Sequence, residues 1–199
     1  MKNSAIMFAA FALALVASCV PSPDESHTAI TPVPDQYKGN VSTIFGNGGA
    51  LKKDSLGNII ASNIIWKDSL GNSQSINSLR GDIIILNFWA TWCPYCIEEI
   101  PDLLLVANEF KDDNVKIVGV SIDKTGKPLE DVKDYAALKK MTYQIVLDQY
   151  SKSYVDYGGS ATSPVLPWTF IINRDGNIYK KISGKTNKTE LERIIKEIL

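Results

Sequence analysis

The stretch "NFWATWCPYCIEEIP", Asn87–Pro101, decides the fold. It places two cysteines, Cys93 and Cys96, three residues apart behind one apolar run and in front of an amphipathic one. The run "DIIILNFWA" (Asp82–Ala90) has the length and continuous apolar character of a strand that is buried on both faces. Cys93–Phe110 predicts a helix, because its apolar side chains recur on one face. The cysteine pair therefore lies where a strand gives way to a helix.

The rest of the chain alternates strand and helix patterns. Strands are predicted at Val115–Asp123, Tyr143–Asp148, and in a hairpin of "WTFIIN" and "NIYKKIS" around the turn Arg174–Gly176. Helices are predicted at Pro128–Met141, in a short segment ending at Tyr157, and over a C-terminal apolar stripe (Leu191, Ile194, Ile195, Ile198) with Asn187 or Thr189 as its cap. This order predicts an α/β domain with a mixed central β-sheet flanked by helices.

A short repeat precedes these elements. "KDSLGN" occurs at Lys53–Asn58 and again at Lys67–Asn72. A calcium loop would need more oxygen ligands than the one carboxylate in each copy. Two β-turns with glycine at a positive φ explain the pattern better, so we expect an N-terminal β-hairpin extension.

The first residues have the features of a targeting segment. After Lys2, Ala5–Ala17 forms an apolar run of 13 residues, about 20 Å as a helix and too short for a hydrocarbon core of about 30 Å. The run ends in "LVASC", which resembles the lipobox of bacterial lipoproteins. We predict that residues 1–18 are a lipoprotein signal peptide and that Cys19 is lipidated. The alternative is ordinary cleavage that leaves Cys19 as a free thiol.

Residues 19–43 are predicted to be a flexible tether, since they hold four prolines and few large apolar residues. Residues 44–199 then form one domain by length. The chain carries 21 Lys and Arg against 22 Asp and Glu, a net charge of −1. This balance offers no basic patch, and we expect no nucleic-acid partner.

The position of the cysteines suggests redox chemistry. A helix N-terminus favours the thiolate form of Cys93, and Pro94 suits the first helical position. We expect Cys93 to be an exposed nucleophile and Cys96 to be a buried resolving thiol. Zinc would need about four nitrogen or sulfur ligands, and a purely structural bridge over so short a loop gains little entropy. We therefore predict a redox-active Cys93–Cys96 disulfide with no metal and no other cofactor.

"LNFWATWCPYCIEEIP", "VLPWTFIINRDG" and the leader together resemble the TlpA/ResA branch of the thioredoxin-like proteins, over about Asn58–Leu199. The resemblance implies a thioredoxin-like fold. It also implies an extracytoplasmic thiol–disulfide oxidoreductase that is tethered to a membrane and usually acts as a reductant.

The resemblance also implies roles for individual residues. Pro167 matches a cis-proline that packs against the disulfide, with the Leu166 backbone open to a substrate strand. The alternative is a trans-proline that starts a strand. Glu99 matches the family's active-site glutamate, whose pKa burial raises and which takes a proton from Cys96. The alternative for Glu99 is a surface carboxylate at a helix start, as we expect for Glu98.

The dipeptide and the aromatic residues around the cysteines are assigned to substrate binding. Trp92, Pro94, Tyr95 and Trp168 are the predicted substrate-binding residues beside Leu166. Trp89 either joins Trp92 and Trp168 in an apolar platform around the disulfide or belongs to the core. Asn87 stands where ordinary thioredoxin has a buried aspartate, so any general base must be Glu99.

We predict an enzyme that is lipid-anchored in the bacterial cell envelope and reduces disulfides in exported proteins, such as apocytochrome c. Its electrons must come from a membrane donor, because no nicotinamide or flavin motif is present. A disulfide-forming oxidant is the alternative with the same chemistry. A peroxiredoxin-like peroxidase needs Pro-x-x-x-Thr-x-x-Cys, whereas Thr91 is two residues before Cys93. A non-enzymatic adaptor would not need both cysteines.

Overall fold

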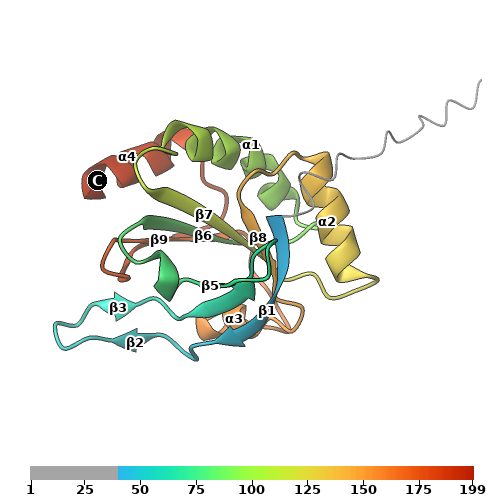
Figure 1. Cartoon of the computed structure of the whole chain (residues 1–199), viewed down its shortest axis with the longest axis horizontal. Helices are drawn as coiled ribbons and strands as arrows, with labels where there is room; N and C mark the ends of the chain where they lie inside the picture. The colour runs from blue at the N-terminus through green and yellow to red at the C-terminus, as the bar shows by residue number, and fades with distance from the viewer. Residues whose placement is uncertain (1–39) are drawn as a thin grey trace, which may run out of the picture. The chain divides into compact units, whose positions relative to one another are not determined.

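A computed structural model of the chain describes residues 40–199 (Figure 1). The predicted signal peptide, the lipidation site Cys19 and the tether up to residue 39 lie outside the described residues. The first strand begins at Val41, inside the range predicted as tether, because Val41 and the next two residues pair in register with a strand that starts near Ile145. The folded domain therefore begins three residues earlier than predicted.

Eight strands form one mixed sheet in the order β10-β9-β6-β7-β8-β1-β4-β5, and β2 pairs with β3. The strands are β1 (Val41–Asn47), β2 (Lys52–Lys53), β3 (Ile59–Ile60), β4 (Ile64–Lys67), β5 (Ser73–Ser75), β6 (Ile83–Trp89), β7 (Val115–Ser121), β8 (Gln144–Leu147), β9 (Trp168–Ile172) and β10 (Ile178–Ser183). The helices are α1 (Pro94–Glu109), α2 (Pro128–Leu138), α3 (Lys152–Asp156), α4 (Lys188–Ile198) and the 3₁₀ turn η2 (Asn77–Leu79). The predicted α/β fold with a mixed sheet is confirmed.

Strand β6 lies at the centre of the fold, and all seven of its residues are buried. It pairs in parallel with β7 and antiparallel with β9. Strand β8 pairs in parallel with both β7 and β1, and so joins the two halves of the sheet. The sequence of a strand that is covered on both faces is a continuous apolar run, and this pattern predicts β6.

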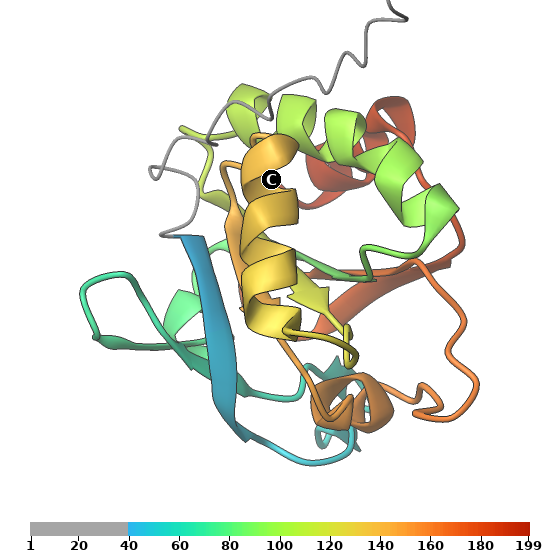
Figure 2. The same cartoon turned by 90° about the vertical axis from the view of Figure 1, so that its right-hand side faces the viewer.

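Helices α1, α2 and α4 cover one face of the sheet, whereas α3 and the β2–β3 hairpin lie on the other (Figures 1 and 2). Side chains alternate along β6 accordingly. Asn87 reaches toward α1, and Trp89 contacts Tyr135 of α2. Phe88 points the opposite way and contacts Tyr154 of α3. Helix α4 is capped by Asn187, one of its two predicted caps, which accepts a hydrogen bond from the Glu190 amide.

The repeated "KDSLGN" segments form two hairpins where one was predicted. The first turn joins β2 to β3 and the second joins β4 to β5. In each copy the aspartate accepts hydrogen bonds from the leucine and asparagine amides that follow it. Gly57 and Gly71 have φ of 88° and 83°, as the predicted turns require. The second hairpin is part of the main sheet because β4 pairs with β1.

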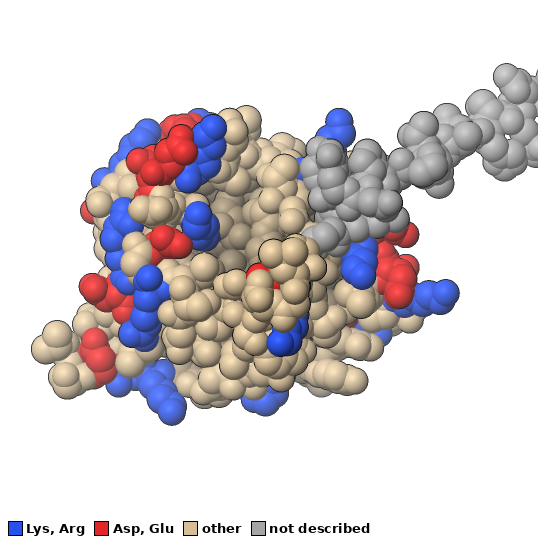
Figure 3. Space-filling view, in the orientation of Figure 1, with Lys and Arg blue, Asp and Glu red and all other residues tan. Residues whose placement is uncertain are grey.

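Acidic and basic side chains are interspersed on the face drawn in Figure 3 and do not gather into a patch of one sign. Along α4 they form ion pairs one turn apart, such as Arg193 with Glu197. Among residues 40–199 there is no helix with the length and apolar composition that crossing a membrane requires.

Candidate active site

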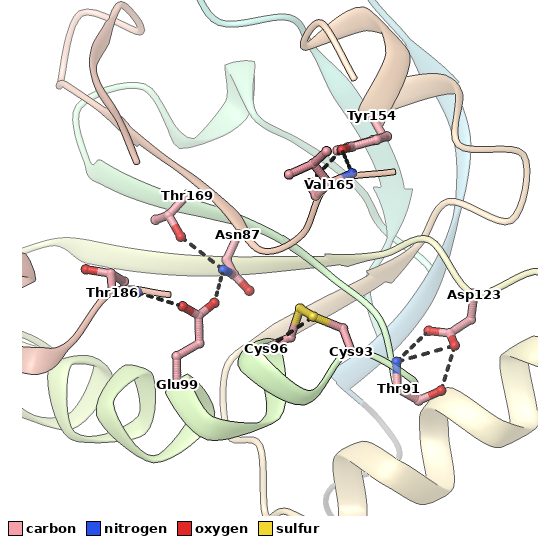
Figure 4. Close-up of a disulfide and its surroundings, with 10 residues drawn as sticks. All are labelled: Asn87, Thr91, Cys93, Cys96, Glu99, Asp123, Tyr154, Val165, Thr169 and Thr186. Carbon is pink, nitrogen blue, oxygen red and sulfur yellow. Dashed lines mark hydrogen bonds between the residues drawn. A yellow bond between two sulfur atoms is a disulfide. The ribbon is translucent and has the colours of Figure 1, made fainter. Parts of the chain in front are cut away.

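Cys93 and Cys96 form a disulfide at the start of α1, with their Cα atoms 5.3 Å apart (Figure 4). Cys93 is the N-cap of the helix, and its Sγ accepts a hydrogen bond of 3.2 Å from the Cys96 amide. Pro94 occupies the first helical position, as predicted. The unsatisfied N–H groups of the first turn therefore surround the sulfur that would become a thiolate.

Cys96 is buried, as predicted, but Cys93 is more covered than expected. Cys93 was predicted to be exposed, but it is only 5% exposed, against 1% for Cys96. In the disulfide, the Cys93 Sγ is bonded to Cys96 and so points toward the core. Cys93 is more exposed than Cys96, as predicted, but Cys93 is buried and not exposed as the prediction required.

Glu99 lies one turn after Cys96 and has no exposed surface. Its Oε1 accepts a hydrogen bond of 2.7 Å from Asn87 Nδ2, and its Oε2 accepts one of 3.1 Å from the Thr186 amide. Burial raises the pKa of Glu99 to about 7, although the two hydrogen bonds act in the opposite direction. Glu99 can therefore gain or lose a proton near neutral pH. The alternative of a surface carboxylate is wrong.

Asn87 connects Glu99 to the sheet. Besides its bond to Glu99, its Nδ2 donates to Thr169 Oγ1 of β9 at 3.0 Å. A carboxylate at this position would repel Glu99, whereas the amide donates to it. Asn87 thus orients Glu99.

Glu98 differs from its neighbour because it lies on the outer side of α1. It is exposed and pairs with Lys185 Nζ at 2.7 Å. This pairing raises the pKa of Lys185.

A second buried carboxylate holds the segment before the cysteines, and sequence reasoning missed it. Asp123 accepts hydrogen bonds from the Thr91 hydroxyl at 2.6 Å and from the Thr91 amide at 3.1 Å. The Ser121 hydroxyl donates to it at 2.6 Å. The signal was present in the sequence, because Asp123 directly follows the apolar strand β7, and β7 pairs in parallel with β6. Polar residues at the carboxyl ends of adjacent parallel strands lie close together.

The Leu166–Pro167 peptide bond is cis, as predicted. Pro167 is buried, and its carbonyl accepts a hydrogen bond from the Gly184 amide at 2.9 Å. Leu166 is half-buried, and Val165 before it is 60% exposed. The Tyr154 hydroxyl, which sequence reasoning also missed, bonds to the Val165 backbone (Figure 4).

The tryptophans do not form the predicted platform. Trp92 is 54% exposed and Tyr95 62%, on either side of Cys93 and Pro94. Trp89 belongs to the core, at 1% exposed. Trp168 pairs with Phe88 across the sheet, so it lies on the face opposite to Trp89.

Trp168 instead lies within an aromatic cluster. Its ring centroid is 5.2 Å from that of Tyr154 and 6.2 Å from that of Phe170. Lys181 Nζ lies 3.3 Å from the centre of the Trp168 ring, and burial lowers the pKa of this lysine.

Comparisons with known proteins identify the family of the chain. The model of the AhpC/TSA family matches residues 60–181. The thiol-disulfide oxidoreductase ResA of Bacillus thuringiensis (strain Al Hakam) is 30% identical over 138 residues, 69% of this chain and 76% of that protein. The crystal structure of StoA from Bacillus subtilis has a TM-score of 0.56 and 28% identity, covering 67% of this chain and 96% of that one.

A further structure shares the fold. The putative thiol:disulfide interchange protein DsbE from Chlorobium tepidum has a TM-score of 0.63 at 21% identity, and covers 74% of this chain and 99% of that one. The cysteine pair at a helix start, the family match and the ResA similarity agree. The chain therefore belongs to the AhpC/TSA family and is a thiol–disulfide oxidoreductase of the ResA-like group.

Proposed function

We propose that the protein works outside the cytoplasm, tethered to a membrane, and reduces disulfides in exported proteins, with apocytochrome c as a substrate class. The observation that supports proton-coupled thiol–disulfide exchange is the buried Glu99, whose pKa is about 7, one turn after Cys96. Reduction of a substrate requires Cys96 to lose its proton, and a carboxylate with this pKa is suited to accept it. In the oxidising direction Cys96 leaves as a thiolate and protonated Glu99 can return the proton to it, so the reduction potential decides the net direction.

In the reducing direction the reaction has two exchanges. The Cys93 thiolate attacks one sulfur of the substrate disulfide, that S–S bond breaks, and the other substrate sulfur leaves as a thiolate and takes up a proton. Cys96 then gives its proton to Glu99 and attacks Cys93 Sγ, which releases the second substrate sulfur. That second sulfur leaves as a thiolate and takes the proton that Glu99 received from Cys96, while the first takes its proton from the solvent. Two electrons and two protons therefore reach the substrate. A dithiol donor at the membrane must return them, and no further cofactor is needed.

The substrate segment is proposed to lie against Leu166, next to Pro167, with Trp92, Pro94 and Tyr95 beside it. The last three are exposed around the disulfide and suit contact with a protein chain. Trp168 contributes indirectly, because its ring packs against Tyr154, whose hydroxyl bonds to the Val165 backbone.

Trapping of mixed disulfides tests the roles of the cysteines. Cys96→Ser should accumulate complexes joined through Cys93, because the resolving step is lost. Cys93→Ser should trap few. If instead Cys93→Ser traps most of the substrate, the assigned order of attack is wrong.

Rates across pH test Glu99. Glu99→Gln removes the proton acceptor and should slow the reduction of a protein disulfide by about 10²-fold. Glu98→Gln, at the exposed neighbouring position, is the matched control and should keep the wild-type rate. Equal rates for the two variants at every pH would remove Glu99 from the mechanism.

The reduction potential separates reductant from oxidant. We expect a value more negative than about −200 mV, in the range of reducing proteins of this fold. A potential near −120 mV, typical of a strong oxidant, would support the disulfide-forming alternative.

The anchor is proposed from the sequence alone. Cleavage before Cys19 and acylation of its thiol would place the protein in the cell envelope. Mass spectrometry of the mature N-terminal peptide should find a lipid-modified cysteine, and an unmodified thiol there would refute the anchor.

A further inference from the structure

The side chain of Tyr154 contacts both ends of the loop that leads into the cis-proline, residues 159–166, and Figure 4 shows its contact with Val165. The Tyr154 hydroxyl donates to the Val165 carbonyl at 2.8 Å and accepts from the Val165 amide at 3.0 Å. At the other end, Gly159 lies flat against the Tyr154 ring. A Cβ atom on Gly159 would come within 2.3 Å of that ring, so only glycine fits there.

Tyr154 is itself rigidly held. It has no exposed surface, and its ring centroid lies 5.5 Å from that of Phe88 and 5.2 Å from that of Trp168. Its amide donates to Asp148 Oδ2 at 3.0 Å. The hydroxyl is therefore fixed in position before any substrate arrives.

The middle of the loop is also tied down. Lys124 Nζ donates to the Ala161 carbonyl at 2.9 Å. Lys124 directly follows Asp123, which holds Thr91 before the cysteines. Within the loop the Ser163 amide donates to Ser160 Oγ at 3.2 Å. The loop is thus held at both ends and in the middle by groups that belong to the rigid domain.

This loop presents an apolar edge. Val165 is 60% exposed although the backbone beneath it is fixed, and Leu166 is half-buried. Near the disulfide, Trp92 and Tyr95 are also more than half exposed. Apolar side chains exposed on this loop and next to the disulfide favour contact with a protein chain, and a loop ordered in advance loses less entropy on binding.

We propose that Tyr154 is a positioning residue that preorganises the 159–166 loop, so that Val165, with Trp92 and Tyr95, selects substrate segments carrying apolar side chains next to their cysteine. This inference rests on the proposed reduction of protein disulfides. It assigns Tyr154 to substrate binding and leaves the exchange chemistry to the cysteines and Glu99.

The test compares two tyrosines of one aromatic cluster. Tyr154→Phe keeps the ring and removes both bonds to Val165. Tyr157→Phe is the matched control, since its hydroxyl donates to the buried Ser62 carbonyl at 2.7 Å and not to the loop. Two substrates are used with dithiothreitol as donor: a peptide disulfide with leucine beside each cysteine, and bis(2-hydroxyethyl) disulfide, which is too small to reach the loop.

For Tyr154→Phe we expect KM for the leucine peptide to rise about fivefold, with kcat and the rate on the small disulfide unchanged. Tyr157→Phe should leave all three values at the wild-type level. An unchanged KM in Tyr154→Phe, or an equal rise in both variants, would overturn the positioning role. Wild-type protein that reduces neither substrate would instead refute the proposed function.

Val165→Ser tests the apolar edge without touching the core. Wild type should have a lower KM for the leucine peptide than for one with lysine beside each cysteine, and Val165→Ser should reduce this preference. If wild type handles the two peptides equally well, the selectivity is wrong even where Tyr154→Phe behaves as expected.

Discussion

On the α1 side of the sheet, Asn87 of β6 and Thr169 of β9 hydrogen-bond in a buried group with Glu99, whereas on the other side Phe88 packs among aromatic rings. Hydroxyls on the aromatic side donate to backbone carbonyls, such as that of Tyr157 to Ser62. One side therefore buries a group that titrates near neutral pH. The other buries apolar area, which supplies stability that does not depend on pH in this range.

The largest loss of stability is expected on the aromatic side. Phe170 is 2% exposed, and its ring lies 4.9 Å from that of Tyr157 and 6.0 Å from that of Phe88. Phe170→Ala should lower the free energy of unfolding by about 4 kcal/mol, through lost burial and the cavity left behind. Urea unfolding of the oxidised wild-type protein and of the variant measures this difference in the free energy of unfolding. A loss below about 1 kcal/mol would mean that this cluster is not a main source of stability.

The next largest effect is a pH dependence that belongs to Glu99. Its pKa is about 7 in the folded protein and 4.5 without the fold, so the native state holds the extra proton between these values. The free energy of unfolding should therefore fall by about 3 kcal/mol as pH rises through this window. Oxidised protein is used because the disulfide does not titrate.

Glu99→Gln should lose this pH dependence, and Glu98→Gln should keep it. Unfolding curves at about pH 4.5 and about pH 8 suffice. If the free energy of unfolding of Glu99→Gln falls with pH as steeply as that of wild type, another group is responsible for the titration.

Deleting one hydrogen-bonding group on each side sharpens the comparison. Asn87→Leu leaves the Oε1 of Glu99 without its donor and should cost about 2 kcal/mol, while Tyr157→Phe should cost about 1 kcal/mol. Only Asn87→Leu should move the pH dependence. Because the Asn87 bond lowers the pKa of Glu99, its loss should shift the fall in stability to higher pH. Identical pH profiles for the two variants would contradict the division between the two sides.

The smallest effect is expected at the surface. Lys185→Met breaks the exposed pair with Glu98 and should cause no measurable loss of stability, since exposed ion pairs contribute little. The lysine charge also lowers the pKa of Glu99, so the variant should shift that pKa slightly upward. Titration of the Glu99 side-chain carboxyl by NMR checks the direction, and a downward shift would be inconsistent with this arrangement.

Local patterns predicted most of this site. The strand-to-helix junction placed Cys93 at the N-cap, and the helical spacing placed Glu99 inward, because both depend on residues within one or two turns. The partners of Glu99 were not predictable in this way. Thr186 lies 87 positions further along the chain and contributes a backbone amide, which has no signature in the sequence.

Most of the features that the sequence did not predict also depend on contacts between distant parts of the chain. Tyr154 contacts Val165 only because α3 folds back against the loop before the cis-proline. The exposure of Cys93 depends on the direction of its Sγ in the disulfide. The turn chemistry of "KDSLGN" was correct for each copy, but which strands the two turns join depends on pairing with β1.

The pairing of β1 with β8 also bears on how the chain assembles as it is synthesised. Val41 pairs with Ile145, whereas the other neighbour of β1 is strand β4, which is much closer in the chain and pairs Ile64 with Asn47. At roughly 5–20 residues per second, the ribosome delivers β8 roughly 5–20 s after β1. Through that interval one edge of β1 offers unpaired N–H and C=O groups, which other chains can use for intermolecular pairing. For a nascent molecule this strand, which β7 and β8 separate from β6 in the sheet, is therefore a vulnerable segment.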